Sequence, residues 1–459
     1  MSGDELADAL ALANAHRDGR SPRAGARRDG RRHATAADGA PKAEDVRHLD
    51  WPRARAVAAR AGARRRAESV TLPLGSALDH RLAEALTALT DLPAFDTSAM
   101  DGWAVSGPGP WALDGWEPDG WEPGGAEAAR GVLAGDDAPP PLPDGHAVGI
   151  ATGARIPPGA TAVLRSEYGE VRDRRLHAPR APQHGADIRP RGQECRQGDH
   201  LLPAGTRVTP AVLGLAAAAG WDELSVLRRP RAEVLVLGDE LLTSGRPEGG
   251  RVRDALGPMI GPWLAALGVQ PLATRRLGDD AEALYEALAG TTADLVVTTG
   301  GTAFGPVDHV HPALRRLGAT LLVDGVAVRP GHPMLLARLP AGAHLVGLPG
   351  NPLAAVSGLL TLAEPLLRAV PGTGRSTEPS RTGPVDGAPP TAPLLDEVHG
   401  HPRDTRLVPV VQDGRGVRSL RFTGPAMLRG IAAATALAVV PPGGVAPGTG
   451  VHLLRLPWA

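Results

Sequence analysis

Three loops of the sequence combine glycines, hydroxyl groups and acids in the manner of an oxyanion site. They read Leu-Gly-Asp-Glu at 237–240, Thr-Thr-Gly-Gly-Thr at 298–302 and Gly-Leu-Pro-Gly-Asn-Pro at 347–352. Paired glycines allow backbone N–H groups to approach and hold a phosphate. The loops therefore predict a site for a phosphate or another oxyanion, although a Gly-Gly pair also occurs in ordinary tight turns.

Two acids beside these loops, Glu240 and Asp308, are candidate ligands of a magnesium ion. A carboxylate next to a bound oxyanion repels it unless a divalent cation lies between them, and Mg²⁺ prefers oxygen ligands. The alternative is structural: Asp308 caps the following helix, and Asp239 is a solvated loop acid. The sequence has no Gly-x-x-x-x-Gly-Lys-Ser/Thr motif of a P-loop enzyme, and its fifteen histidines show no zinc-ligand spacing.

Two further polar loops lie earlier in the chain. Residues 95–105 read Phe-Asp-Thr-Ser-Ala-Met-Asp-Gly-Trp-Ala-Val, which places two acids, two hydroxyl groups and a glycine turn in one loop. Residues 151–159 read Ala-Thr-Gly-Ala-Arg-Ile-Pro-Pro-Gly, a similar loop. Both are candidates for binding or positioning a substrate.

The composition excludes several classes of protein. Lysine plus arginine number 49 against 50 for aspartate plus glutamate, so the net charge of −1 provides no basic field for nucleic acid or an anionic membrane. The sequence has no run of about 18 apolar residues, so it predicts no membrane span. The single cysteine, Cys195, argues against a disulfide framework and indicates a reducing cytoplasm, where we expect an inert, partly buried thiol.

Two residue types are almost missing. Lys42 is the only lysine, and Asn14 and Asn351 are the only asparagines. An arginine where a mechanism uses lysine is therefore expected from composition alone. Asn351, kept in a Gly-Pro loop against this bias, is more informative.

Residues 230–370 alternate between expected strands and expected helices, and the sheet formed by these strands would position the three oxyanion loops. Short apolar runs at 234–238, 295–299 and 345–348 are typical of strands buried on both faces, and each runs into one of these loops. Apolar residues at helical spacing predict helices at 256–267, 281–288, 312–317 and 352–367. The alternation predicts an α/β three-layer domain with a mainly parallel sheet, whose strand ends bring the loops together.

The flanking regions follow other patterns. An Ala- and Arg-rich helix is expected at 51–67, and apolar spacing from Leu82 to Leu89 predicts a second helix that ends at 91–93. Short β segments are expected at 70–74, 101–105, 147–152, 162–166 and 201–208. The strands of a small C-terminal β-barrel domain are expected near 406–411, 416–422, 436–440 and 450–454.

These patterns divide the chain into domains. Residues 1–47 have hardly any large apolar side chain, so we expect a disordered tail whose deletion leaves the melting temperature and the activity almost unchanged. The near repeat at 115–123 is expected to be a loop insertion. The other parts are an elongated helical/extended domain (48–92 and 199–229), an inserted β domain (93–198), the α/β domain (230–371), a linker (372–382) and the C-terminal β domain (383–459).

Five motifs together resemble the molybdopterin molybdenumtransferase family of the MoeA type, which includes the E domains of gephyrin and of the plant enzyme. The matching segments, in chain order, are 96–104, 152–159, 238–241, 300–305 and 348–354. The first follows the family's Asp-Asn-Ser-Ala-Met-Asp-Gly-Tyr-Ala and the last its Leu-Pro-Gly-Asn-Pro-x-Ala. The resemblance runs from about residue 48 to the end and implies an elongated, homodimeric, four-domain subunit whose α/β domain binds molybdopterin.

The resemblance also implies an activity in molybdenum cofactor biosynthesis. The family takes adenylylated molybdopterin and molybdate, inserts the metal and releases AMP, and it requires Mg²⁺. The substrates are small molecules. Protein partners of such an enzyme would be molybdopterin adenylyltransferase or molybdoenzyme acceptors.

Carried over residue by residue, the family pattern implies roles for single side chains. Asp101 and Thr152 would act in hydrolysis or substrate positioning. Glu240, Asp279 and Asp308 would lie at the cation and molybdopterin side, with Glu240 and Asp308 as metal ligands. The implied substrate-binding residues are Ser98, Gly300, Gly301, Pro349, Gly350, Asn351, Arg329, His332 and Arg403.

The sequence departs from the family pattern mainly at the molybdate end. The family's Lys-Pro-Gly-Lys reads Arg-Pro-Gly-His at 329–332, a serine after glycine is Pro425, and of Arg-x-x-Phe only Arg403 remains. An aspartate is replaced by Glu194 and a helix-start asparagine by Leu256. These changes keep an alternative open: a divergent, non-catalytic paralog that binds molybdopterin or the finished cofactor as a carrier or scaffold.

Overall fold

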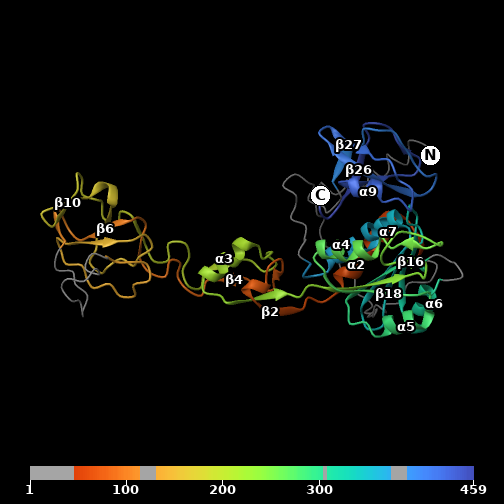
Figure 1. The fold of residues 1–459 in the computed structure, drawn as a ribbon, viewed down its shortest axis with the longest axis horizontal. Coiled ribbons are helices and arrows are strands. Elements are labelled where there is room, and N and C mark those ends of the chain that lie inside the picture. The colour runs from red at the N-terminus through yellow and green to blue at the C-terminus, as the bar shows by residue number, and fades with distance from the viewer. Residues whose placement is uncertain (1–45, 114–130, 303–307, 374–389) are drawn as a thin grey trace, which may run out of the picture. The chain divides into compact units, whose positions relative to one another are not determined.

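The structure is a computed structural model, drawn in Figure 1. It describes residues 46–113, 131–302, 308–373 and 390–459. The near repeat at 115–123 and Gly305 of the glycine motif lie outside these residues, as do most of the expected tail and linker. None of the helices in the described part is long and apolar enough to cross a membrane.

A seven-stranded sheet forms the centre of the α/β domain. In spatial order its strands are β1 (Arg47–Leu49), β20 (Thr320–Val326), β22 (Leu335–Arg338), β23 (His344–Leu348), β19 (Leu295–Thr299), β15 (Arg231–Leu237) and β18 (Gln270–Leu277). β22 runs antiparallel to both neighbours, and the remaining pairs are parallel. The prediction of a mainly parallel sheet is confirmed.

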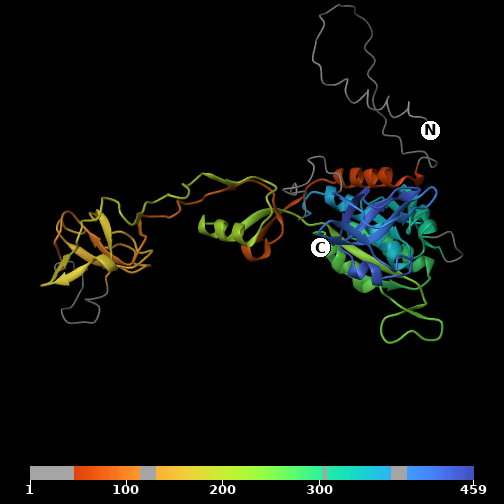
Figure 2. The same ribbon diagram turned by 90° about the horizontal axis from the view of Figure 1, so that it is seen from above.

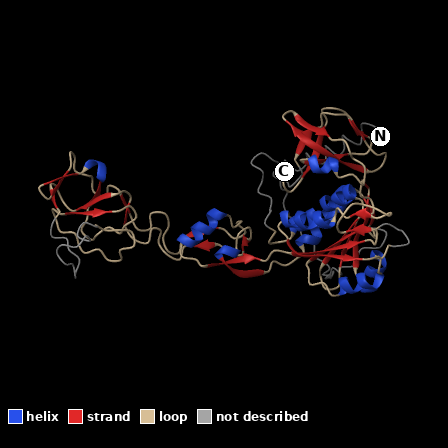
Figure 3. Cartoon of the chain, in the orientation of Figure 1, coloured by secondary structure: helices blue, strands red, loops and turns tan. Residues whose placement is uncertain are grey.

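Helices cover both faces of this sheet (Figure 3). One face carries α4 (Gly257–Ala266) and α7 (Pro352–Gly358), and the other carries α5 (Ala281–Ala289) and α6 (Val310–Leu317). The side chains of β15 alternate between the layers: Val234 and Val236 pack in the core of α4 and α7, whereas Leu235 and Leu237 pack in the core of α5 and α6. Burial on both faces explains the uninterrupted apolar runs of the sequence.

The ends of these helices fix the loops at the strand ends. The Asp280 carboxylate accepts the N–H groups of Glu282 and Ala283 and so starts α5 directly after β18. Gly318, with φ of +73°, ends α6 in the left-handed region that glycine adopts without strain. α7 continues into a π-helical turn (Leu359–Ala363) and α8 (Glu364–Ala369).

The region between Leu82 and Leu89 forms small sheets, so the helix predicted there is wrong. β14 (Glu223–Leu227) pairs with β2 (Ser69–Pro73) and β3 (Arg81–Leu82), and β4 (Leu86–Thr87) pairs with β13 (His200–Leu202), beside α3 (Pro210–Ala218). The N–H group of Ala83 donates to the carbonyl of Ser225 rather than to a residue of its own turn. Pairing with distant segments has overridden the local spacing of leucines.

The inserted domain consists of short strands, as predicted. Its strands are β5 (Thr97–Ser98), β6 (Gly102–Val105), β7 (Trp111–Ala112), β8 (Ala147–Ile150), β9 (Ala162–Arg165), β10 (Glu170–Arg172), β11 (Arg175–His177) and β12 (Ile188–Arg189). β6 lies between β8 and β9, and β5 pairs with β12. The two polar loops of this region therefore start and end on paired strands.

The C-terminal residues form the predicted small β-barrel. Its strands follow the order β24 (Thr391–Pro393), β30 (Gly450–Arg455), β28 (Ala436–Val440), β26 (Thr405–Asp413) and β27 (Gly416–Ser419). A bridge between Leu394 and Val417 closes the ring. β21 (Val328–Arg329) leaves the α/β domain and pairs in parallel with β26, which sets Arg329 beside the loop before Thr405.

The folded chain begins before the predicted boundary at residue 47. Val46 and Leu49 are buried, and Arg47–Leu49 is strand β1, which pairs with β20. β1 leads into α2 (Trp51–Ala63), the red helix of Figure 2, whose first turn is capped by Asp50. A boundary at residue 47 therefore cuts through β1.

Removing β1 is expected to destabilise the fold. A chain that starts at Asp50 should be less stable than one that starts at Val46 by about 3 kcal/mol, because burying one Val or Leu side chain contributes about 1.5–3 kcal/mol. Urea unfolding of the two chains measures the difference. Coincident unfolding curves would mean that β1 adds nothing to the sheet.

Candidate active site

The three oxyanion loops meet at the carboxyl ends of β15, β19 and β23. Val236 pairs with Thr299, and Thr299 pairs with Leu348, so the three strands end at one level. The Gly300 N–H group donates to the Leu348 carbonyl at 2.9 Å. A Cβ added to Gly350 would lie 3.7 Å from the Cα of Gly300. The glycines of two loops therefore lie against each other.

The glycine pair after β19 is required by its backbone. Gly300 and Gly301 have φ angles of +83° and +63°, which side chains other than glycine rarely adopt. A Cβ at Gly301 would also approach the side chains of Leu237 and Val310 at 3.2 Å. The pair keeps the backbone bare at the strand end, which suits a cradle for an oxyanion and equally a tight turn.

The turn 349–351 leads into α7. Its proline is buried, and Asn351 is exposed, with no capping hydrogen bond from its side chain. The N–H groups of Leu353 and Ala354 instead donate to the carbonyl of Pro425, at 2.8 and 3.3 Å. Pro425, at the position where the family pattern has serine, thus caps α7 and leaves the Asn351 amide exposed.

The acids of the first loop are exposed at the rim of this site. Gly238 has a φ of +131°, and the Glu240 carboxylate folds back over it, 2.4 Å from where a Cβ would be. A Cβ on Gly278 would likewise lie 2.6 Å from Oδ1 of Asp239. Asp279, next in the chain, is exposed too. The ends of β15 and β18 therefore line up three carboxylates.

Asp308 is bound to a histidine and to its own helix. Its Oδ1 accepts the Val310 N–H group at 3.1 Å, and its Oδ2 lies 2.9 Å from Nδ1 of His311, whose Nε2 lies 2.9 Å from Oδ1 of Asp324. The aspartate side chains are 6% and 8% exposed. Hydrogen bonds to Asp308 and then to Asp324 outweigh burial and raise the pKa of His311 to about 9. A cationic imidazole therefore bridges two buried carboxylates.

The two predicted magnesium ligands differ in accessibility. Both oxygens of Asp308 already take part in hydrogen bonds, whereas Glu240 is exposed. Within the described ranges, no three His, Cys, Asp or Glu side chains are grouped as a metal site. Magnesium often takes one or two carboxylates together with substrate phosphates. The donors present fit a cation shared with a phosphorylated substrate rather than one held by protein alone.

Sequence reasoning missed three polar side chains near this site, of which Asp254 and Asp324 are buried and His311 is partly buried. His311 and Asp324 come from different elements, so no local motif relates them. Asp254 is buried, accepts the N–H group of Leu256 at 2.9 Å and pairs with Arg276. An acid directly before an apolar helix signals such a cap. Leu256 is itself buried, so this position offers a ligand no polar group.

Hydrogen bonds join the two earlier polar loops, residues 95–105 and 151–159, to each other. Oδ1 of Asp101 accepts the Thr152 N–H group at 2.7 Å, and this bond, with the Thr152 hydroxyl, lowers the pKa of the Asp101 carboxyl. The Ser98 N–H group donates to the Ala154 carbonyl, and the Gly153 N–H group donates to the Ser98 carbonyl, both at 2.9 Å. Ser98 is buried, and its hydroxyl donates to a backbone carbonyl at 2.6 Å. Ser98 thus shapes the loop, while Asp101 and Thr152 remain exposed.

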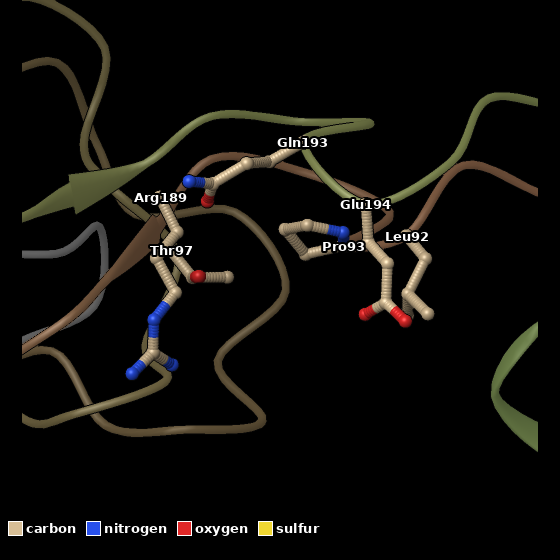
Figure 4. A pocket seen from close by; sticks show the side chains of 6 residues that line it. All are labelled: Leu92, Pro93, Thr97, Arg189, Gln193 and Glu194. Carbon is tan, nitrogen blue, oxygen red and sulfur yellow. The ribbon is translucent and has the colours of Figure 1, made fainter. Parts of the chain in front are cut away.

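A cavity of about 400 Å³ opens next to Thr97 (Figure 4). Its walls are formed by Leu92, Pro93, Thr97, Arg189, Gln193 and Glu194. Thr97 pairs with Arg189 across β5 and β12, so the first polar loop borders the cavity. The neighbouring Cys195 is buried, and burial raises the pKa of its thiol, as expected for an inert cysteine.

The residues predicted at the molybdate end gather between β21 and β26. Nε of Arg329 donates to Oδ2 of Asp404 at 2.8 Å, and Arg403 precedes that acid on an exposed loop. Burial raises the pKa of Asp404, but the hydrogen bond from Arg329 and nearby cationic groups, His332 among them, bring it below its usual value. Nδ1 of His332 lies 2.8 Å from the Val326 carbonyl. Arg329 and His332 thus lie beside Asp404 in one cluster, called here the basic cluster, and Arg403 adjoins Asp404 in the sequence.

Three family models match most of the chain. They are described as the MoeA N-terminal region (domains I and II), matching residues 49–220, a probable molybdopterin-binding domain, matching 233–369, and the MoeA C-terminal region (domain IV), matching 391–456. Together they follow the order of the domains described above.

The chain is also similar to named proteins and solved structures. It is 34% identical over 314 residues to a molybdopterin molybdenumtransferase of Synechococcus elongatus, covering 66% of this chain and 76% of the relative. It is 32% identical over 308 residues to that of Bacillus subtilis, covering 66% and 70%. A molybdopterin biosynthesis MoeA protein of Pyrococcus horikoshii superimposes with a TM-score of 0.68 at 22% identity, covering 89% of this chain and 99% of that one, which shows a common fold.

Proposed function

The chain belongs to the molybdopterin molybdenumtransferase family, and we propose that it inserts molybdate into adenylylated molybdopterin with release of AMP. The observation that carries the proposal is the convergence of three loops at the ends of β15, β19 and β23. Bare backbone at Gly300, Gly301 and Gly350 and the exposed Asn351 amide suit the phosphate and pterin of such a substrate.

Cleavage of the substrate's pyrophosphate requires neutralisation of its negative charge. When bound, a magnesium ion would supply the neutralising positive charge. Glu240 would hold the ion, and Asp279 would face the substrate from the same rim. Asp308, held by its hydrogen bond to His311, would be a second carboxylate ligand.

Two further groups complete the proposal. Asp101 and Thr152 would orient the adenylate or the water that attacks it, because their exposed polar groups are already held together. Arg329, His332 and Arg403 would bind molybdate. We also propose a two-fold homodimer, the commonest closed symmetry, in which residues of the partner complete each site. Its protein partner would be molybdopterin adenylyltransferase or a molybdoenzyme.

Release of AMP tests the transferase. The purified chain with adenylylated molybdopterin, molybdate and Mg²⁺ should release AMP, and Glu240→Gln should slow the release by roughly 10–100-fold, as is usual when a contact of a metal site is lost. Glu248→Gln, which changes an exposed glutamate outside the three loops, is the matched control and should leave the rate unchanged.

The same assay separates the transferase from a carrier. A wild-type chain that binds molybdopterin but releases no AMP would favour a non-catalytic paralog. AMP release that is equally fast in Glu240→Gln would contradict the proposed cation site alone.

A further inference from the structure

Two histidine rings from different parts of the chain lie face to face. The imidazoles of His48 and His332 have centroids 4.9 Å apart and planes 12° apart. His48 is in the middle of β1, and His332 follows β21 in the basic cluster. Strand β1 therefore reaches the same place as Arg329 and Arg403, although 284 residues separate the two histidines in the sequence.

The backbone holds His48 in an uncommon conformation. Its φ angle is +50°, in the left-handed region that residues other than glycine seldom adopt. Hydrogen bonds pin the strand on both sides of it: the Asp324 N–H group donates to the Val46 carbonyl, and the Ala327 N–H group donates to the Leu49 carbonyl, both at 2.8 Å. Such strain persists where surrounding structure enforces it, often at binding sites.

A glycine with left-handed backbone lies beside the stack. Gly325 has a φ of +84°, and a Cβ there would lie 3.4 Å from Nδ1 of His48 and 3.6 Å from the backbone oxygen of His332. Both histidines therefore pack over the same bare backbone. The arrangement fixes the two rings side by side rather than leaving two independent exposed side chains.

Two acids lie beside the stack, Asp324 next to His48 and Asp404 next to His332. Asp324 of β20 lies close enough to His48 for an electrostatic interaction, and it also forms ion pairs with Arg47 and His311. Asp404 lies close enough to His332 for an electrostatic interaction, and it also forms ion pairs with Arg329 and His401. Each ring thus has one acid neighbour, and further cationic or titratable groups gather around the two acids.

The imidazole nitrogens of the stack that make no hydrogen bond with a described residue are available to a ligand. Nδ1 of His332 is committed to the Val326 carbonyl, which leaves Nε2. Neither ring nitrogen of His48 makes a hydrogen bond with a residue that the structure describes, and the side chain is exposed. Two parallel imidazoles can donate to neighbouring oxygens of one tetrahedral anion.

We propose that His48 is a second imidazole of the oxyanion pocket, so that strand β1 provides part of the wall that binds molybdate. The proposal rests on the proposed function of the 329–332 loop. His48 lies just before residue 49, where the family match starts, so no family motif covers it. The competing explanation is that the stack only fastens β1 to the sheet.

Titration calorimetry of the full chain with sodium molybdate at pH 6 and low ionic strength tests the proposal. His48→Asn is the main variant, because asparagine tolerates a positive φ angle. Losing one charge-assisted donor from a partly exposed site should weaken molybdate binding by about tenfold. His332→Asn should have a similar effect. His399→Asn is the control, since that imidazole is 89% exposed and no ring contact joins it to the stack among the described residues.

A second measurement needs no substitution. Diethylpyrocarbonate labels exposed imidazoles, and mass spectrometry should show that molybdate protects His48 and His332 but not His399. This readout holds even where His48→Asn lowers the melting temperature.

The outcomes separate the two proposals. Wild-type affinity in His48→Asn, with weaker binding in His332→Asn and no protection of His48, would overturn the role of β1 and leave the molybdate loop in place. A wild-type chain that releases AMP without measurable molybdate binding would also overturn it, with the proposed function standing. Absence of both molybdate binding and AMP release would overturn both.

Discussion

Replacing Asp294 by alanine is expected to lower the free energy of unfolding by about 3 kcal/mol, the lower end of what breaking a buried ion pair costs. Its carboxylate, 9% exposed, binds Arg65 at 2.6 Å and both terminal nitrogens of Arg228 at 2.8 and 3.1 Å. It also accepts the Arg231 N–H group at 2.7 Å. The variant leaves two guanidinium groups without their shared partner.

The loss should be large because Asp294 ties together three separate segments. Arg65 follows α2, and Arg228 and Arg231 precede and begin β15. Burial raises the pKa of Asp294, but the hydrogen bonds from Arg228 and the Arg231 N–H group bring it below its usual value. The carboxylate is therefore charged at neutral pH and fully engaged.

Urea unfolding at pH 7 measures this effect. Glu170→Ala is the matched control, because Glu170 and Arg172 form an ion pair with side chains 62% and 64% exposed, and such exposed pairs contribute little to stability. Asp294→Asn keeps the shape and should fall between the two. Equal losses in Asp294→Ala and Glu170→Ala would show that burial adds nothing to this network.

The parts of the site that follow from local sequence could be predicted. The runs around Val234, Val297 and Val346 are buried on both faces, so their apolar patterns signal strands directly. Gly300 and Gly301 sit at positive φ angles, which only glycine adopts readily, so their identity marks the turn. Local signals of this kind located the three loops and the order of the domains.

The features that depend on distant pairing could not be predicted. The leucines from Leu82 to Leu89 have helical spacing, yet their backbone pairs with other segments. His48 lies in sequence without apolar periodicity, and only its pairing beside β20 brings it to His332. The bridge from Asp308 through His311 to Asp324 joins a helix start to a strand. Apart from the i,i+3 pair of Asp308 and His311, no spacing in the sequence encodes these contacts.

Raising the pH from 7 to 9.5 is expected to destabilise the chain by about 2 kcal/mol through His311 alone. The pKa of this imidazole is about 9 in the fold, against about 6.5 in an unfolded chain. A raised pKa means that the folded state holds the proton more tightly, so the stabilisation is complete below about pH 6.5 and is lost as pH rises through 9. The difference between these two pKa values corresponds to about 3 kcal/mol, and partial solvent screening reduces it.

His311→Gln separates this effect from other titrating groups. Urea unfolding at pH 7, 8, 9 and 9.5 should show the wild type well above the variant at pH 7 and the two converging by pH 9.5. His309→Gln, a neutral replacement at the preceding N-cap of α6, is the control and should run parallel to the wild type. Wild-type and His311→Gln curves that stay parallel over this range would mean that His311 is not protonated between its two aspartates. Asp308 would then be a buried carboxylate without a cationic partner, and a metal ion could supply the missing positive charge. Convergence of the curves would mean that His311 already neutralises Asp308, and Glu240 would remain the more accessible metal ligand.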